Sequence, residues 1–457
     1  MQNRTSRPRV AVVGGGLAGL ECALGLLKEG CSVEVIEVGH QSRKRHVYWD
    51  PSKHIGDDKV QRWTSEAWGA GGGLSERFGG RSLCYHGVFL EPAQPIGPIW
   101  GKIWEDRLTG DKGLYKEITA KLADYYTELQ SPNEYAHSNE LNLHHVPQAA
   151  RLDEQARFEA YSPLYELSHF IGLEQLKITK GLATRASLKP DGWRVIVQGS
   201  TAEEELDRRF DACVLATSAI CNMQILASSL KRDITTTITD HFCIGILVKI
   251  SDGKKLGPFR HKMIWSGYVP VPELASNIFF SERSQLPTGE RIIELTACIE
   301  QAGNPDQYST LSVRRNVEGS PQTHIHGNIS VKDVARLELM RAELKCWAEK
   351  IAGHSLKQIA ARFSNYDTAM AAIIGSEDSR VFCAYEWPYG AFEHESCSHP
   401  IGDTSGISIS NDLEVLELPG MYVSGPGVFP RLTEANPALT IVAVSQGLAR
   451  LLSSKFE

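Results

Sequence analysis

A glycine-rich turn near the start of the chain has the residue types and spacing of a phosphate-binding loop. The apolar run at residues 9–13 is followed at once by GGGLAG at residues 14–19, which has the GxGxxG pattern of dinucleotide sites. In this pattern Gly14 permits the tight turn, Gly16 lets a pyrophosphate approach the backbone, and Gly19 lets helix and strand pack closely. The sequence therefore predicts a dinucleotide held by backbone N–H groups at a helix N-terminus.

Three elements must hold this loop in place. Residues 9–13 are typical of a buried strand, residues 20–30 of an apolar helix stopped by glycine, and residues 32–37 of a second strand. The second strand ends in Glu37, whose carboxylate we expect to accept hydrogen bonds from the adenosine ribose hydroxyls. The alternative is a glycine-rich turn in an ordinary α/β protein, but the terminal carboxylate favours the dinucleotide site.

Composition bounds the class of protein. The chain has 457 residues, of which 42% are hydrophobic and 23% charged, and its net charge is -7. These values indicate a soluble globular protein of two or three domains and argue against nucleic acid as a partner. No apolar stretch reaches the roughly 18 residues of a membrane span, and the polar N-terminus leaves no room for a signal peptide. We therefore expect a cytoplasmic protein.

Cysteine usage agrees with a reducing compartment. The ten cysteines are scattered and form no CxxC pair, so the sequence supports neither a metal site nor a disulfide framework. We expect most of the thiols to be small buried apolar groups.

The remaining elements are predicted from periodicity and turn residues. A second glycine-rich region, residues 69–87, precedes no long apolar helix and is typical of irregular backbone lying close to a ligand. The predicted helices are 115–128, 331–352 ending at Gly353, a shorter one capped by Ser355, and Pro437 to Leu452. The predicted strands are 176–178 and 193–197, joined as a hairpin through Pro190-Asp191-Gly192, then 212–217, 421–425, and 244–250 with 291–297 in an antiparallel sheet.

The order of these elements predicts an α/β fold with a split Rossmann-type nucleotide-binding domain. Its pieces are expected at residues 1–95, 170–235 and 396–457. An α+β substrate-binding domain built on the antiparallel sheet is expected at residues 96–169 and 236–395.

Five segments spread from residue 9 to residue 453 together resemble the glucose-methanol-choline (GMC) family of FAD-dependent oxidoreductases. They are the glycine turn, the GGRS sequence at 79–82, the VLATSAI sequence at 214–220, Thr239-Asp240-His241, and the block from 412 to 440. The last block is most similar to the pyranose and choline oxidase branches, which carry Asn-Pro as Asn436-Pro437 does here. The chain departs from the family in having Ser424-Gly425 where an aspartate is usual, a degenerate segment after His394, and a short overall length.

The resemblance implies that FAD is the cofactor. The residues that it assigns to FAD binding are Gly14, Gly16, Leu17, Ala18, Gly19, Glu37, Gly79, Gly80, Ser82, Cys84, Ala216, Ser424, Gly425, Asn436, Pro437 and Leu439. Cys84 occupies the position where some family members carry a flavin-linked histidine. We therefore expect non-covalent FAD, with a cysteinyl link as the alternative.

The family's chemistry moves a hydride from an alcohol carbon to flavin N5, and a histidine removes the hydroxyl proton. Both His394 and His399 fit this role. His394 leaves a loop of plausible length before the strand at 407 and is favoured, and His399 stays open because it begins an HPxG sequence. Asn436 is predicted to cap the last helix, with Pro437 as its first residue, and also to orient the substrate oxygen.

The functional hypothesis is an FAD-dependent alcohol oxidase or dehydrogenase acting on the CH–OH group of a polar polyol: a sugar, cyclitol, aminosugar or nucleoside. Its partners are that small molecule and an electron acceptor, either oxygen or another compound. Tyr385, Trp387 and Tyr389 either line the substrate cavity or stack in the core. The alternatives are a lyase or decarboxylase on the same scaffold and a flavoprotein-like binding module without catalysis.

Overall fold

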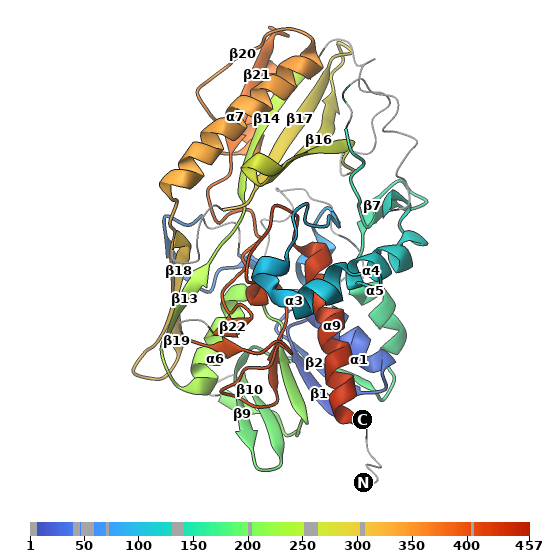
Figure 1. Cartoon of the computed structure of the whole chain (residues 1–457), viewed down its shortest axis with the longest axis vertical. Helices are drawn as coiled ribbons and strands as arrows, with labels where there is room; N and C mark the ends of the chain where they lie inside the picture. The colour runs from blue at the N-terminus through green and yellow to red at the C-terminus, as the bar shows by residue number, and fades with distance from the viewer. Residues whose placement is uncertain are drawn as a thin grey trace.

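The computed structural model describes residues 7–39, 46, 59–69, 73–129, 141, 143–199, 203–250, 264–301, 307–403 and 406–457. Two large sheets organise the chain, with one at each end of the molecule (Figure 1).

The first sheet is parallel and five-stranded. Its order is β24 (Met421–Val423), β12 (Ala212–Leu215), β1 (Arg9–Val13), β2 (Ser32–Glu37) and β8 (Leu176–Lys180), and every neighbouring pair is parallel. Such sheets are covered on both faces and have nearly continuous apolar strands, as in β12, where all four residues are buried. This is the predicted Rossmann-type sheet.

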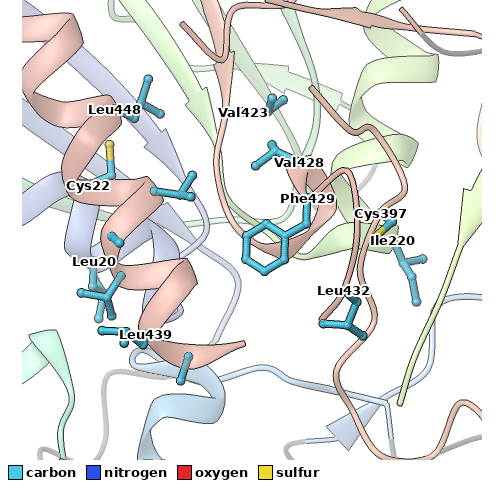
Figure 2. Close-up of a cluster of buried hydrophobic side chains, with 14 of the residues drawn as sticks. Leu20, Cys22, Ile220, Cys397, Val423, Val428, Phe429, Leu432, Leu439 and Leu448 are labelled. Atoms are coloured by element: carbon cyan, nitrogen blue, oxygen red, sulfur yellow. The ribbon is translucent and has the colours of Figure 1, made fainter. Parts of the chain in front are cut away.

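Helices α1 (Leu17–Lys28) and α9 (Ala438–Phe456) pack against each other (Figure 1) although they begin more than 400 residues apart. Glu21 of α1 is 1% exposed. It accepts hydrogen bonds from the Tyr161 hydroxyl and, at 3.1 Å, from Nε2 of Gln446 on α9. The apolar side chains around this contact include Leu20, Leu439 and Leu448 (Figure 2).

One hairpin prediction was wrong. Residues 176–178 belong to β8, which extends the parallel sheet beside β2. The partner of β10 (Gly192–Gln198) is β9 (Ala183–Lys189), and the turn between them falls at the predicted Pro190-Asp191. The mostly polar sequence of β9 hid this strand, because only Ala186 along it is fully buried.

The second sheet has the order β15 (Gly267–Val271), β16 (Ser276–Gln285), β17 (Arg291–Ile299), β14 (Phe242–Ile250), β21 (Val381–Glu386) and β20 (Lys357–Gln358). The antiparallel pairing of 244–250 with 291–297 is confirmed, and Ile244 lies opposite Ala297. All nine residues of β14 are buried, since α7 (Val331–Ala352) and α8 (Tyr366–Gly375) both contact this strand.

Helix α7 has the predicted bounds. Ser330 and Asp333 form a reciprocal capping box, and Gly353 ends the helix at φ 75°. No helix begins at Ser355: residues 357–358 form β20 beside β21, and the next helix, α8, is capped by Asn365. The predicted helix 115–128 is divided into α4 (Leu114–Ala123) and a 3₁₀ turn at Thr127–Leu129.

A third sheet, together with shorter elements, lies between the two large ones (Figure 1). Its order is β13 (Ile234–Ile238), β18 (Ser309–Arg315), β19 (Pro321–His326) and β4 (Thr64–Glu66). The other elements are β3 (Lys59–Val60), β5 (Leu74–Ser75), β6 (Ala150–Leu152), β7 (Phe158–Ala160), β11 (Glu203–Glu205), β22 (Gly402–Asp403), β23 (Ser408–Ile409), α3 (Gly97–Thr109), α5 (Pro163–Leu167) and α6 (Ala219–Leu230).

The domain boundaries drawn from the sequence stay a prediction. Among the described residues, no helix combines the length and apolar character needed to cross a bilayer.

We predict that Leu20→Ala lowers the free energy of unfolding by about 2–5 kcal/mol, because it opens a cavity between α1 and α9. Leu188→Ala is the matched control. Leu188 is 51% exposed, so its truncation changes stability by no more than about 0.5 kcal/mol. Urea unfolding followed by circular dichroism measures both variants, and equal losses would contradict the assigned core.

Candidate cofactor and active site

The glycine turn is shaped by contacts that exclude side chains at two of its positions. Gly14 has φ +104°, and a Cβ added there would lie 2.4 Å from the carbonyl oxygen of Ala216 at the end of β12. A Cβ on Gly19 would lie 1.9 Å from the Gly14 oxygen. At Gly16, by contrast, no protein atom lies within 4 Å of an added Cβ. The first two glycines serve packing, whereas Gly16 borders open space.

The helix that begins at this turn has no side-chain cap. Gly16 is the N-cap of α1, Leu17 and Ala18 begin the helix, and its first turn contains no acidic residue. The first N–H groups of a helix lack partners within the helix and attract anions. The N-terminus of α1 beside Gly16 therefore suits a pyrophosphate.

Glu37 holds the glycine turn itself. Its Oε2 accepts a hydrogen bond from the Gly15 N–H at 2.6 Å, and its Oε1 accepts one from the Gly39 N–H at 2.7 Å. Burial raises the pKa of this carboxyl, and the two backbone N–H groups oppose that rise. Each oxygen keeps a second lone pair, so the ribose contact stays a prediction beside this structural role.

The second glycine-rich segment packs directly on the first. The Gly79 N–H donates to the Gly15 oxygen at 2.8 Å, and a Cβ on Gly80 would lie 3.0 Å from the Gly16 Cα. The Ser82 hydroxyl is buried and bonds to Gly79 O at 2.6 Å and to Ser162 Oγ at 2.7 Å. The Ser82 hydroxyl therefore stabilises the turn at residues 79–82 through buried hydrogen bonds. The buried Cys84 thiol donates to the Arg81 oxygen.

The C-terminal segment that contains Ser424 and Gly425 also packs against the start of α1. Gly425 has φ +99°, and a Cβ there would lie 3.4 Å from the Ala18 Cβ. The Ser424 N–H donates to Leu215 O at 2.9 Å, and its hydroxyl lies 2.8 Å from Ser445 Oγ on α9. Ser424 and Gly425 therefore join the end of β12 to both α1 and α9.

Asn436 does not cap the last helix, so that prediction was wrong. Pro437 is the N-cap of α9, which carries no side-chain cap, and the buried Leu439 lies in its first turn. The buried Asn436 Oδ1 has no hydrogen-bond partner within the described residues. An unpaired buried amide oxygen costs about 1–3 kcal/mol. This oxygen is therefore available to accept a hydrogen bond from a ligand.

His394 lies among groups that keep it uncharged. Its Nδ1 is 2.8 Å from Nδ1 of His241, its backbone N–H donates to Asp240 Oδ1 at 3.1 Å, and the Phe392 ring lies edge-on at 4.6 Å. Burial lowers the pKa of His394 well below its ordinary 6.5, and His241 and the positive charge of Arg81 lower it further. The ring is therefore neutral at neutral pH.

An ion pair ties the His394 segment to the glycine-rich segment. Nη1 and Nη2 of Arg81 donate to the two oxygens of Glu395 at 2.6 and 3.0 Å, and Nη1 also donates to the Glu393 carbonyl at 2.8 Å. Burial acts to lower the pKa of Arg81, but Glu395 and Glu393 raise it above its usual value. Arg81 therefore stays charged and fixes His394 relative to Gly79 and Gly80.

His399 sits in a different environment. It is fully buried, with Nδ1 2.8 Å from Ser398 Oγ and Nε2 3.3 Å from Asn222 Nδ2. Burial lowers the pKa of His399 to about 3. Both of its ring nitrogens are occupied, and a Cβ on Gly427 would overlap its ring. The geometry therefore favours His394 as the base.

Apolar side chains gather next to His394 and Asn436. Phe392, which contacts His394, packs against a cluster that includes Trp265, Phe279 and Ala435, the residue before Asn436. Sequence analysis missed this cluster, because only the β15–β16 pairing brings Tyr268 opposite Phe279. No local signal reports that pairing.

The aromatic residues singled out in the sequence pack in the core instead. The Tyr385 hydroxyl donates to Glu294 and lies 2.8 Å from Thr296 Oγ1, and Trp387 packs on the same cluster under α8. The Tyr389 hydroxyl donates to Gln301 Oε1 at 2.5 Å. The hydroxyl groups of Tyr385 and Tyr389 are therefore satisfied within the protein.

One group of side chains has the spacing of metal ligands. The ligand atoms of His241, Cys298 and His394 all lie within 4.8 Å of one another. The 2.8 Å separation of the two Nδ1 atoms is a hydrogen-bond distance, so one nitrogen donates and the other accepts. This arrangement is a hydrogen-bonded pair rather than a coordination sphere.

The chain matches a family model and a known protein, each over a short segment. Residues 9–47 match the family model of pyridine nucleotide-disulphide oxidoreductases. The chain is 40% identical to C-glycoside 3-oxidase of Arthrobacter globiformis over a segment of 70 residues. This segment makes up 15% of this chain and 14% of that protein. The match thus spans a small part of the relative's length.

Solved structures match along the whole chain. Pyridoxine 4-oxidase from Mesorbium loti has a TM-score of 0.60 at 16% identity and covers 97% of this chain and 99% of its own. An FAD-dependent oxidoreductase from Chaetomium thermophilum has a TM-score of 0.63 at 13% identity, covering 99% and 100%. The chain has the fold of an FAD-dependent oxidoreductase. The open space at Gly16, the uncapped N-termini of α1 and α9 and the unpaired Asn436 oxygen all fit FAD.

We predict that Gly16→Ala weakens FAD binding about tenfold or more, equivalent to about 1.4 kcal/mol or more, without changing the stability of the apoprotein. The added methyl group meets no protein atom and intrudes only on the bound pyrophosphate. Gly375→Ala, where an added Cβ also meets nothing, is the control and keeps full affinity. Fluorescence titration with FAD measures both variants, and equal affinities would contradict the placement of the phosphates.

Proposed function

We propose that the protein is an FAD-dependent enzyme of the GMC type that oxidises an alcohol CH–OH group to a carbonyl. The observation that carries this proposal is the hydrogen bonding around the His394 imidazole. Its Nε2 makes no hydrogen bond within the described residues, and Arg81 ties its segment to the glycine turns. An alcohol is a very weak acid, so its oxidation needs a positioned base of this kind.

Each group has a distinct task in the proposed reaction. His394 Nε2 accepts the hydroxyl proton while the Asn436 amide N–H₂ donates a hydrogen bond to the substrate oxygen. FAD, when bound, accepts the hydride. The partial positive charge at the N-terminus of α9 favours negative charge that develops nearby. The apolar cluster around Phe392 keeps water from the base.

We propose a polar polyol as the substrate: a sugar, cyclitol, aminosugar or nucleoside. The support is the pyranose-oxidase-like block at the C-terminus and the partial match to C-glycoside 3-oxidase. The Phe392 cluster offers an apolar wall for the C–H face of such a ring. Oxygen or another compound then takes the electrons.

Anaerobic mixing with a panel of sugars, cyclitols, nucleosides and heteroaromatic alcohols tests the activity. A substrate of the proposed class bleaches the flavin absorbance in the dark. A lyase or photodecarboxylase produces no such bleaching. A flavin that no alcohol reduces would refute the proposed function.

We predict that His394→Gln slows flavin reduction by about 10²–10⁴-fold, the usual contribution of a general base, and leaves FAD content unchanged. Asn436→Ala also slows reduction and retains FAD. His354→Gln is the control, because His354 is exposed beyond the end of α7. Stopped-flow absorbance measures the rates, and a His394 variant that reduces flavin at the wild-type rate would exclude it as the base.

The pH dependence has a defined sign. Because the pKa of His394 is lowered well below 6.5, the imidazole keeps its lone pair as pH falls through that value. The rate of flavin reduction should therefore stay constant through pH 6.5 and decline only in more acidic buffer. Stopped-flow measurements across pH test this, and an acid limb centred at 6.5 would show that the base is solvated.

A further inference from the structure

We propose that His241 is a positioning residue that fixes the proton of His394 on Nδ1 and leaves Nε2 as the proton acceptor. This inference rests on the proposed function, because it concerns the atom that takes the hydroxyl proton. It is carried by a chain of hydrogen bonds that runs from Thr433 through His241 to His394.

The first bond decides the tautomer of His241. Its Nε2 lies 2.6 Å from the carbonyl oxygen of Thr433. A carbonyl oxygen can only accept, so Nε2 carries the proton. Burial lowers the pKa of His241 to about 4, so the ring is neutral. Nδ1 of His241 therefore presents a lone pair.

The second bond passes this constraint to His394. The Nδ1 atoms of the two rings lie 2.8 Å apart, and two lone pairs facing each other at this distance would repel. The proton between them must come from His394, since the proton of His241 is on Nε2. The neutral His394 ring then carries its lone pair on Nε2. That nitrogen makes no hydrogen bond within the described residues, so it is open to a substrate hydroxyl.

The backbone holds the two rings in register. Asp240 Oδ1 accepts hydrogen bonds from the backbone N–H groups of both His241, at 2.7 Å, and His394, at 3.1 Å. Thr239 and Ser396 exchange two backbone hydrogen bonds of 3.1 and 2.9 Å. The imidazoles therefore meet because their main chains are joined directly beside the contact.

The same chain of bonds ends on the segment that carries the other catalytic candidate, Asn436. Thr433 lies three residues before Asn436, and the carbonyl of the intervening Glu434 accepts from Asn277 Nδ2 at 2.9 Å. His241 thus connects the segment that carries Asn436 to the segment that carries His394. A residue in this place sets the tautomer of the base and links both segments.

Two substitutions separate these roles from simple packing. In His241→Gln, the amide oxygen can accept from His394 Nδ1 while the amide N–H₂ donates to Thr433. In His241→Leu, both bonds are lost. We expect the leucine variant to reduce flavin at least about tenfold more slowly than wild type with an unchanged substrate dissociation constant and FAD content. We expect the glutamine variant to recover most of the rate.

Nitrogen-15 NMR of histidine-labelled, FAD-loaded protein reads the tautomer directly, with His394→Gln assigning the signals. The expected result is an unprotonated Nε2 and a protonated Nδ1 at His394 in the wild type and the glutamine variant, with a tautomer mixture in the leucine variant. An unprotonated Nδ1 at His394 in the wild type, a leucine variant with wild-type rate, or stoichiometric zinc bound at the two rings would each overturn the inference.

The two proposals can fail separately. If no alcohol reduces the flavin, the proposed function is refuted, and the NMR signals still decide which nitrogen of His394 is protonated. If flavin reduction occurs with the other tautomer at His394, the positioning role is refuted and the alcohol oxidation stands.

Discussion

The N–H groups at the start of a helix must find partners, and α1 and α9 are among the described helices that begin without side-chain caps. α1 begins at Gly16 beside open space, and α9 begins at Pro437 next to the unpaired oxygen of Asn436. A bound cofactor with a pyrophosphate and a polar ring system would satisfy both ends. The contact between α1 and α9 includes the hydrogen bond from Gln446 to Glu21. Leu20 of α1 and Leu439 of α9 lie in the apolar cluster at this contact (Figure 2).

The proposed reaction also requires that the His394 segment lie close to the glycine turns, although it belongs to a separate part of the chain. The Arg81–Glu395 ion pair meets this requirement, because it joins the turn that packs on Gly15 to the segment of His394. Both partners are largely buried, so loss of one would leave an uncompensated charge at a cost of about 3–5 kcal/mol. Such a pair contributes position more than net stability.

Short sequence patterns predicted the helices and strands that depend on neighbouring residues alone. The β1–α1–β2 unit follows from an apolar strand, a glycine turn and a helix, and α7 follows from its periodicity, Ser330 and Gly353. β9 was missed because its residues are mostly polar and half-exposed. The Asn436 cap was wrong by one residue, since the helix starts after Pro437. The role of Asn436 as a substrate contact stays a prediction, and its buried Oδ1 has no hydrogen-bond partner within the described residues.

The contacts that define the site lie beyond any local pattern. His241 and His394 are 153 positions apart, and their pairing depends on the antiparallel contact of residues 239 and 396. The sequence singled out both histidines in separate motifs but could not relate them. The choice between His394 and His399 likewise needed their surroundings, because only the structure shows that Asn222 and Ser398 occupy the ring of His399.

A crystal structure of the FAD-loaded protein tests the central claim most directly. The account predicts the pyrophosphate over Gly16 at the start of α1, with the His394 Nε2 and the Asn436 side chain both facing the reactive edge of the flavin ring. A flavin that lies elsewhere, or a His394 ring turned away from it, would contradict the account.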